Sequence, residues 1–347
     1  MQSSFIFKGL ASLAIVLLLA APARAYDDES DFVAEDLSQS PTTVREITRT
    51  ATVAAVQAAL DAILDRNAAL YGFAGAATAE TGATGASGGN GGAGVGVWIS
   101  SGWQYMDTSG SQWSRGGLTT VTGGIDKKIG NAVVGVAVGG EWLRLKMSES
   151  GKFHYDGFSL TPYCSYALQP TLVLDAAMGL GWQDNYQKST YFGSDGQWHN
   201  MNDTYDSWRL FTSAGLSKYW SFDNWVVSGR LGAMYLHQNA SSYTLRGEGV
   251  LPFANDFVDV SKNTTDLFQL SLGGRVGYRL GNFNPFVGVT YVQDVAKSGR
   301  QRDFVGVDFQ LGCTYRAGNF SLGLTGTYGV RQNSQKIGGM LNFRLEF

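Results

Sequence analysis

The sequence predicts an all-β membrane protein, a 12-stranded antiparallel transmembrane β-barrel over residues 95–347 that is preceded by an α-helix. The first observation is a series of runs in which apolar and polar side chains alternate with the period of two expected of a strand. Their spans are 95–107, 114–129, 132–146, 153–168, 171–187, 204–221, 225–241, 264–280, 284–296, 303–316, 319–331 and 335–347. These runs exceed the usual soluble strand of about five or six residues. They reach the roughly 9–11 residues that a tilted transmembrane strand requires.

The second observation is that short and long connections alternate between these runs. Tight turns are indicated by Gly130-Asn131, Gln169-Pro170, Asp223-Asn224, Gly281-Asn282 and Gly318-Asn319. Longer connections lie between them, at 107–113, 147–152, 188–203, 242–263, 297–302 and 332–334. Tight turns at one end and longer loops at the other are typical of bacterial outer-membrane barrels, whose tight turns face the periplasm.

The third observation is the last run, 335–347, which has one apolar and one polar face and ends on an aromatic residue. It resembles the terminal strand that the barrel-assembly machinery of Gram-negative bacteria reads. That resemblance implies an assembly signal at Phe343, Leu345 and Phe347. In a closed barrel this strand would pair with residues 95–107.

The amino terminus has the pattern of a secretory signal peptide over residues 1–25. Lys8 precedes an apolar core, and Ala23-Arg24-Ala25 predicts cleavage between Ala25 and Tyr26. Residues 26–40 are acidic, without Lys or Arg, as expected of a solvated tail. The sequence therefore predicts a protein that leaves the cytoplasm.

A helix is predicted over residues 41–72, with Ser40 as its N-cap and Pro41 at its first position. Its length of roughly 45 Å exceeds the thickness of a membrane core. Arg49, Asp61 and other polar residues exclude a span exposed to lipid, whereas the many alanines suit a helix inside a polar barrel. A periplasmic helix or a self-associating coil is the alternative. Residues 73–94 form a Gly/Ala-rich linker.

Charged residues on the polar parity of the strands are predicted to face the lumen. They are Glu141, Asp175, Arg209, Arg230, Arg275, Arg279, Asp308, Arg316, Arg331, Arg344 and Glu346. They could line a channel, cradle the helix through Asp61 and Asp65, or form an interior network that serves no transport.

Catalysis and cofactors find little support. A net charge of −3 does not favour nucleic acid as a partner. The three histidines are His154, His199 and His237, and only the last has a nearby Asn239 and Ser241 that suggest a hydrolase. We expect no enzyme activity, metal or cofactor. Cys164 and Cys313 follow outward-facing apolar residues, so we expect free thiols. The tryptophans gather towards strand ends, as in an interfacial girdle; they are Trp98, Trp103, Trp113, Trp142, Trp182, Trp198, Trp208, Trp220 and Trp225.

Together, the helix at 42–71, the Gly124–Lys127 stretch before a Gly-rich strand, and the terminal 342–347 resemble the translocator domain of monomeric autotransporters. Two departures stand out, a passenger limited to residues 26–40 and the inserted linker. The resemblance implies an outer-membrane protein of a Gram-negative bacterium that serves translocation, surface display or adhesion through its extracellular loops. Its partners would be outer-membrane lipids, the assembly machinery and a host or surface ligand. The alternative is a porin-like channel gated by the helix, and an outer-membrane hydrolase comes third.

Overall fold

The computed structural model describes residues 40–70, 95–109, 113–148, 151–192, 198–247, 257–297, 305–318 and 320–346. They belong to one compact unit, Leu37–Phe347. Within the helix, side chains are described from Arg49 to Leu64. The predicted cleavage pair Ala25 and Tyr26, the Gly/Ala-rich linker and the terminal Phe347 lie outside the described residues.

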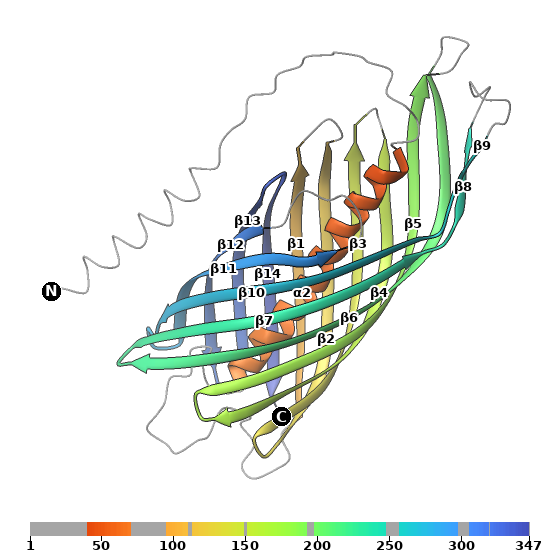
Figure 1. The fold of residues 1–347 in the computed structure, drawn as a ribbon. Coiled ribbons are helices and arrows are strands. Elements are labelled where there is room, and N and C mark those ends of the chain that lie inside the picture. Colours follow the sequence, from red (N-terminus) through yellow and green to blue (C-terminus); the bar gives the residue numbers. More distant parts are fainter. Residues whose placement is uncertain are drawn as a thin grey trace. The chain divides into compact units, whose positions relative to one another are not determined.

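Twelve antiparallel strands close into a barrel, as the sequence predicts (Figure 1). Each pairs with its chain neighbours, apart from the junction of β7 with β10. Their bounds are β1 Val95–Thr108, β2 Ser114–Ile129, β3 Ala132–Met147, β4 Lys152–Gln169, β5 Leu172–Phe192, β6 Trp198–Phe222, β7 Trp225–Ala240, β10 Asn263–Tyr278, β11 Phe283–Lys297, β12 Val305–Ala317, β13 Phe320–Arg331 and β14 Ser334–Glu346.

The barrel closes where the first strand meets the last. Strand β1 pairs with β14 in continuous antiparallel register from Gly96 opposite Glu346 to Thr108 opposite Ser334. The predicted partnership of the terminal strand with residues 95–107 is confirmed. Since closure leaves no free edge among these strands, their backbone groups are paired all round, as a bilayer requires.

The two rims of the barrel differ. At one, which we call the turn rim, two-residue turns place Gly130, Asp223 and Gly281 at φ values of 60°, 50° and 60°. A positive φ matches the twist of a hairpin and is accessible to glycine without steric cost. The other end, the loop rim, carries the longer connections and stands at the top of Figure 1.

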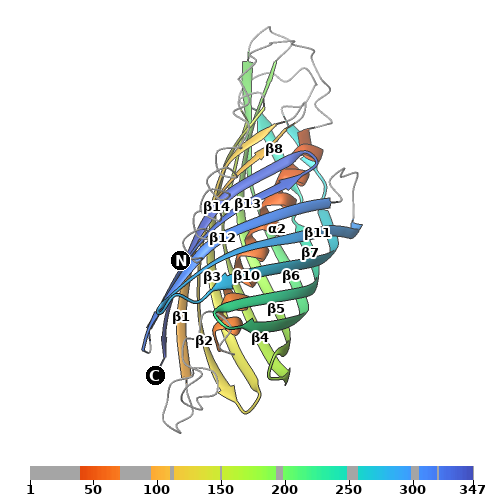
Figure 2. The same cartoon turned by 90° about the vertical axis from the view of Figure 1, so that its left-hand side faces the viewer.

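Two expected loops at the loop rim contain strand. The connection expected at 188–203 is instead mostly a continuation of the β5–β6 hairpin, which is paired as far as Phe192 opposite Trp198. Within the connection expected at 242–263, β8 (Tyr243–Gly247) and β9 (Phe257–Val260) pair with each other, and β8 pairs with β6. These extensions rise above the rim in Figures 1 and 2.

The outer wall is apolar and bears aromatic residues at both rims. Trp142, Trp182 and Trp208 are 44%, 43% and 41% exposed towards the loop rim, and Trp220 and Phe222 are exposed near the turn rim. The girdle interpretation is wrong for Trp98, which is 5% exposed and points inward, where its indole N–H donates to Tyr163 Oη at 2.9 Å. Both cysteines are free, as expected: Cys164 is exposed and Cys313 half-buried.

The single described helix, α2 (Ser40–Leu70), runs through the barrel interior (Figures 1 and 2). Its bounds agree with the expected helix. Of the two locations considered for it, lumen and periplasm, the structure shows the lumen. No helix among the described residues is both long and apolar enough to cross a membrane.

Candidate functional site

The candidate site is the lumen, where α2 contacts the wall with three different faces. Ala51, Ala54 and Ala55 are small enough to approach the wall of β1–β4 closely, where they pack with Leu118, Leu143 and other buried residues. A second face, Val53 and Val56, packs on Phe211, Met234, Leu236 and Leu267 of β6, β7 and β10.

The carboxy-terminal part of the described helix packs in a separate hydrophobic cluster. Ala62 and Ile63 pack with Trp98, Ala137, Tyr163 and Ala177 towards the turn rim. The beginning of the described helix, in contrast, contacts residues near the loop rim. Helix α2 therefore runs from the loop rim to the turn rim, and the chain enters and leaves the lumen at opposite ends.

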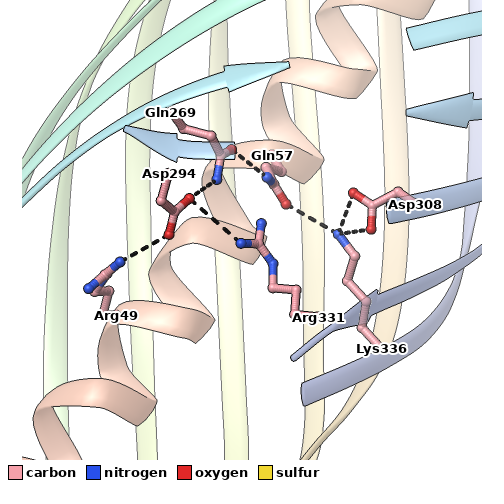
Figure 3. Close-up of polar contacts among 7 residues, drawn as sticks. All are labelled: Arg49, Gln57, Gln269, Asp294, Asp308, Arg331 and Lys336. Carbon is pink, nitrogen blue, oxygen red and sulfur yellow. Dashed lines mark hydrogen bonds and ion pairs between the residues drawn. The ribbon is translucent and has the colours of Figure 1, made fainter. Parts of the chain in front are cut away.

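The third face of α2 is polar and contacts β10–β14 (Figure 3). At its centre is Asp294, with 2% of its side chain exposed. Its carboxylate accepts hydrogen bonds from Arg49 Nη2 of the helix at 3.2 Å and Gln269 Nε2 at 2.8 Å. Arg331 Nη1 lies 3.6 Å from Asp294 Oδ1, the oxygen that also accepts from Gln269. One wall carboxylate thus holds a helix guanidinium and a wall guanidinium together.

A second set of contacts extends this face around the wall. Gln57 donates from Nε2 to Gln269 Oε1 at 2.9 Å and accepts from Lys336 Nζ at 3.2 Å. The same ammonium lies 3.1 Å from Asp308 Oδ1. Because the amide of Gln57 uses both its donor and its acceptor here, the helix has a defined rotation as well as a defined height.

Behind the alanine face of α2, the wall is crossed by a buried ion pair. Arg209 of β6 is 2% exposed and grips Glu141 of β3 with both terminal nitrogens, one of them 3.0 Å from Oε2. Tyr155 donates to the same carboxylate at 3.1 Å. The two-point contact offsets the cost of burying both charges, so this bridge between β3 and β6 braces the wall where the helix side chains are smallest.

Towards the turn rim the lumen opens into a cavity of about 160 Å³. Arg230, Arg275, Arg279 and Asp175 line it, with Asp61 from the helix. Arg230 Nη2 donates to Asp175 Oδ1 at 2.8 Å. The Arg275 guanidinium lies 4.2 Å from the centre of the Phe286 ring and donates to Gln310 at 3.0 Å.

The remaining predicted lumen residues have simpler placements. Arg344 is buried at 6% exposure and Arg316 is half-buried. Glu346 lies on β14, with its side chain outside the description. Of the predicted assembly signal, Phe343 is 41% exposed on the outer wall and Leu345 is half-buried.

The expected pairing of wall arginines with helix aspartates gives only part of the contact. One ion pair between helix and wall has the opposite polarity, with Arg49 on the helix and Asp294 on the wall. Sequence reasoning missed Asp294 and Lys336 as site residues. Strand parity could have found Lys336, which alternates with outward-facing Ile337.

The hydrolase alternative would need a nucleophile at His237. That residue lies on the outer parity of β7, where its Nδ1 is 2.8 Å from Asp266 Oδ1, and Tyr235 donates to the same oxygen at 2.8 Å. No bond between His237 and Ser241 is among its described contacts. The arrangement is a His–Asp–Tyr group on the outer wall.

The β8–β9 hairpin packs onto the tall β5–β6 hairpin through aromatic and polar contacts. Tyr243 stacks on Tyr205 with ring centres 4.2 Å apart, and its hydroxyl donates to Gln187 Oε1 at 2.8 Å. Burial raises the pKa of the Tyr243 hydroxyl, with smaller contributions from Tyr205 and Asp203.

A closed barrel of twelve strands with an apolar outer wall, aromatic rims and a lumen filled by a helix defines an outer-membrane β-barrel. The family model "Autotransporter beta-domain" matches residues 97–335. The chain belongs to this family, and it is an outer-membrane barrel of the autotransporter type. Barrels of this family reside in the outer membrane of Gram-negative bacteria.

Solved structures share the fold at low sequence identity. The translocator domain of autotransporter NalP from Neisseria meningitidis matches with a TM-score of 0.64 and 13% identity, covering 74% of this chain and 90% of that chain. The beta domain of the Bordetella autotransporter BrkA gives 0.61 and 18%, covering 74% and 100%. The transport unit of AIDA-I from Escherichia coli gives 0.52 and 14%, covering 72% and 90%. A search of curated proteins returned no match.

Proposed function

We propose that this barrel resides in the outer membrane of a Gram-negative bacterium and presents the residues that precede α2 on the cell surface. The turn rim then faces the periplasm and the loop rim the exterior. The β5–β6 and β8–β9 hairpins form an adhesive surface for a host or surface ligand. Outer-membrane lipids surround the wall, and the barrel-assembly machinery recognises Phe343, Leu345 and Phe347 on the final strand.

The observation that carries this proposal is the direction of α2. Arg49 is bound near the loop rim, while Ile63 packs near the turn rim where β1 begins. A chain that passes the lumen in this direction has its amino-terminal part at the loop rim. The contacts of Asp294 and Lys336 hold it there.

Protease accessibility on intact cells tests the direction. With an epitope inserted after residue 30, we expect added protease to remove the epitope while the barrel stays intact. A tag at the 170–171 turn serves as the control and should be cleaved only after the outer membrane is opened. If intact cells protected the epitope and protease cleaved the tag at the turn, the barrel would have the opposite orientation in the membrane.

We further propose that the barrel is not an enzyme. Support comes from His237, whose Nδ1 lies 2.8 Å from the Asp266 carboxylate on the outer wall. The test is a His237→Ala variant assayed against ester and peptide substrates beside the wild-type protein. An activity present in the wild type and lost in the variant would contradict this proposal.

A further inference from the structure

The outer wall near the loop rim carries a line of four cations that crosses four neighbouring strands. In the strand register, Arg115 of β2 is opposite Lys146 of β3, which is opposite Lys152 of β4, which is opposite Lys188 of β5. All four lie on the outward parity of their strands. We call them the cationic row.

Such a row is unfavourable by itself. Side chains directly opposite each other in an antiparallel sheet lie about 5 Å apart at Cβ, and like charges there repel. At one end the charge is partly neutralised, because Arg115 Nε lies 3.4 Å from Asp107 Oδ1 and its guanidinium lies 5.1 Å from the Trp113 ring centre. The three lysines have no hydrogen-bond or ion-pair partner among the described residues. An external anion would offset their repulsion.

The rows below the lysines fix the height of that anion. Phe158, Trp182 and Trp208 form an aromatic row in register across β4–β6. One step above it are Asp156, Asp184 and Asp206, also in register. The lysines are three steps above the aromatic row. Six residues along a tilted strand place them about 15 Å above the membrane edge.

The heights of the aromatic, aspartate and lysine rows determine which kind of anion can reach the lysines. A simple phospholipid headgroup sits beside the aromatic row, where it meets carboxylates and cannot reach the lysines. The row also faces sideways along the wall, so its partner must stand beside the barrel. Both conditions fit a membrane glycolipid whose sugars carry phosphate or carboxylate groups well above the bilayer.

We propose that Lys146, Lys152 and Lys188, with Arg115, bind the anionic saccharide core of a glycolipid in the outer leaflet. This inference rests on the proposed location in the outer membrane and on the loop rim facing outward. The site is distinct from the lumen, since the four side chains point away from it. Its role is to fix neighbouring glycolipid against the β2–β5 side of the barrel (Figure 1).

The test measures binding of purified lipopolysaccharide with a phosphorylated core to the folded full-length protein in detergent at low salt. Each basic side chain near an anionic surface contributes about fivefold, so a triple Lys→Gln variant at 146, 152 and 188 should bind roughly a hundredfold more weakly. The matching triple Lys→Arg variant should bind like the wild type. Lys127→Gln removes an exposed outward lysine at the turn rim and should change nothing.

Three results would overturn the inference. One is unchanged binding in the triple Lys→Gln variant. Another is equally tight binding of the same lipid stripped of its core, or of phosphatidylglycerol. A third is equally tight binding of a soluble sulfated polysaccharide, which would indicate a partner outside the membrane.

Cell fractionation and the epitope assay, performed on the same variants, separate this failure from failure of the proposed function. If the wild type is in the outer membrane with its epitope exposed and the triple variant still binds normally, only the glycolipid site is wrong. A wild type absent from the outer membrane would contradict the proposed function first.

Discussion

At the scale of single residues, Asp294 is the critical contact between helix and wall. It is 2% exposed and is shared by Arg49 and Arg331. In Asp294→Asn the buried Arg49 guanidinium and the partly buried Arg331 guanidinium lose their carboxylate, which should destabilise the protein by about 3–5 kcal/mol. Unfolding in guanidinium chloride, followed by tryptophan fluorescence, measures the change in the free energy of unfolding. Asp107→Asn, at a rim pair that is more exposed, should cost no more than about 1 kcal/mol.

The same contact allows a double-mutant cycle. Arg49→Met alone leaves Arg331 to neutralise Asp294, so we expect a smaller loss than in Asp294→Asn. In the double variant, the effects should be strongly non-additive because both changes remove one interaction. Additive losses would show that Arg49 and Asp294 do not act together in the folded protein.

At the scale of elements, the alanine face of α2 determines how closely the helix approaches the wall. Ala55 is 4% exposed among Leu118, Leu143 and their neighbours. Ala55→Leu should overpack this contact at a cost of about 1–3 kcal/mol and make the helix more accessible to protease. Leu64→Phe enlarges a side chain that lines the 160 Å³ cavity and should be tolerated. Equal protease resistance in both variants would contradict close packing of the alanine face.

The β8–β9 hairpin should respond to alkali through Tyr243. Burial raises the pKa of this hydroxyl above its free value. The unfolded hairpin therefore ionises first, so its stability is constant at lower pH and falls as the pH rises past about 10. Limited proteolysis of the hairpin should accelerate in alkali. Tyr243→Phe cannot ionise there and should reduce this acceleration, although it loses the bond to Gln187.

At the scale of the whole molecule, the structure predicts a barrel that conducts poorly. The helix packs against the wall on all three faces, and the two cavities described beside it are small, at about 160 and 40 Å³. In planar bilayers we expect little current from the full chain and a much larger current when residues 26–94 are deleted. Equal, negligible currents from both proteins would exclude a pore hidden behind the helix.

Sequence patterning was sufficient for the barrel because an outer wall in lipid and a polar interior impose a period of two. It failed at 188–192, where the apolar–polar alternation of the sequence stops while strand pairing continues. At Trp98 the amino-acid type favours an interfacial girdle, whereas strand parity with the buried Gly96 and Ser100 places the side chain inward, and parity determines its position. The Arg49–Asp294 pair joins residues 245 positions apart, and no local pattern specifies such a partner.

The closed barrel surrounds a segment of its own chain, the helix that precedes the first strand. Residue 40 is at one rim and residue 95 at the other, so the helix lies along the barrel axis. Strands β1 and β14 have no covalent connection to each other, and only their hydrogen bonds close the barrel. The helix cannot leave the barrel sideways unless the β1–β14 pairing opens along its whole length. Sideways release therefore requires a large cooperative rupture, and sliding along the axis requires loss of the Arg49 and Gln57 contacts, so the bound arrangement should persist kinetically after conditions cease to favour it.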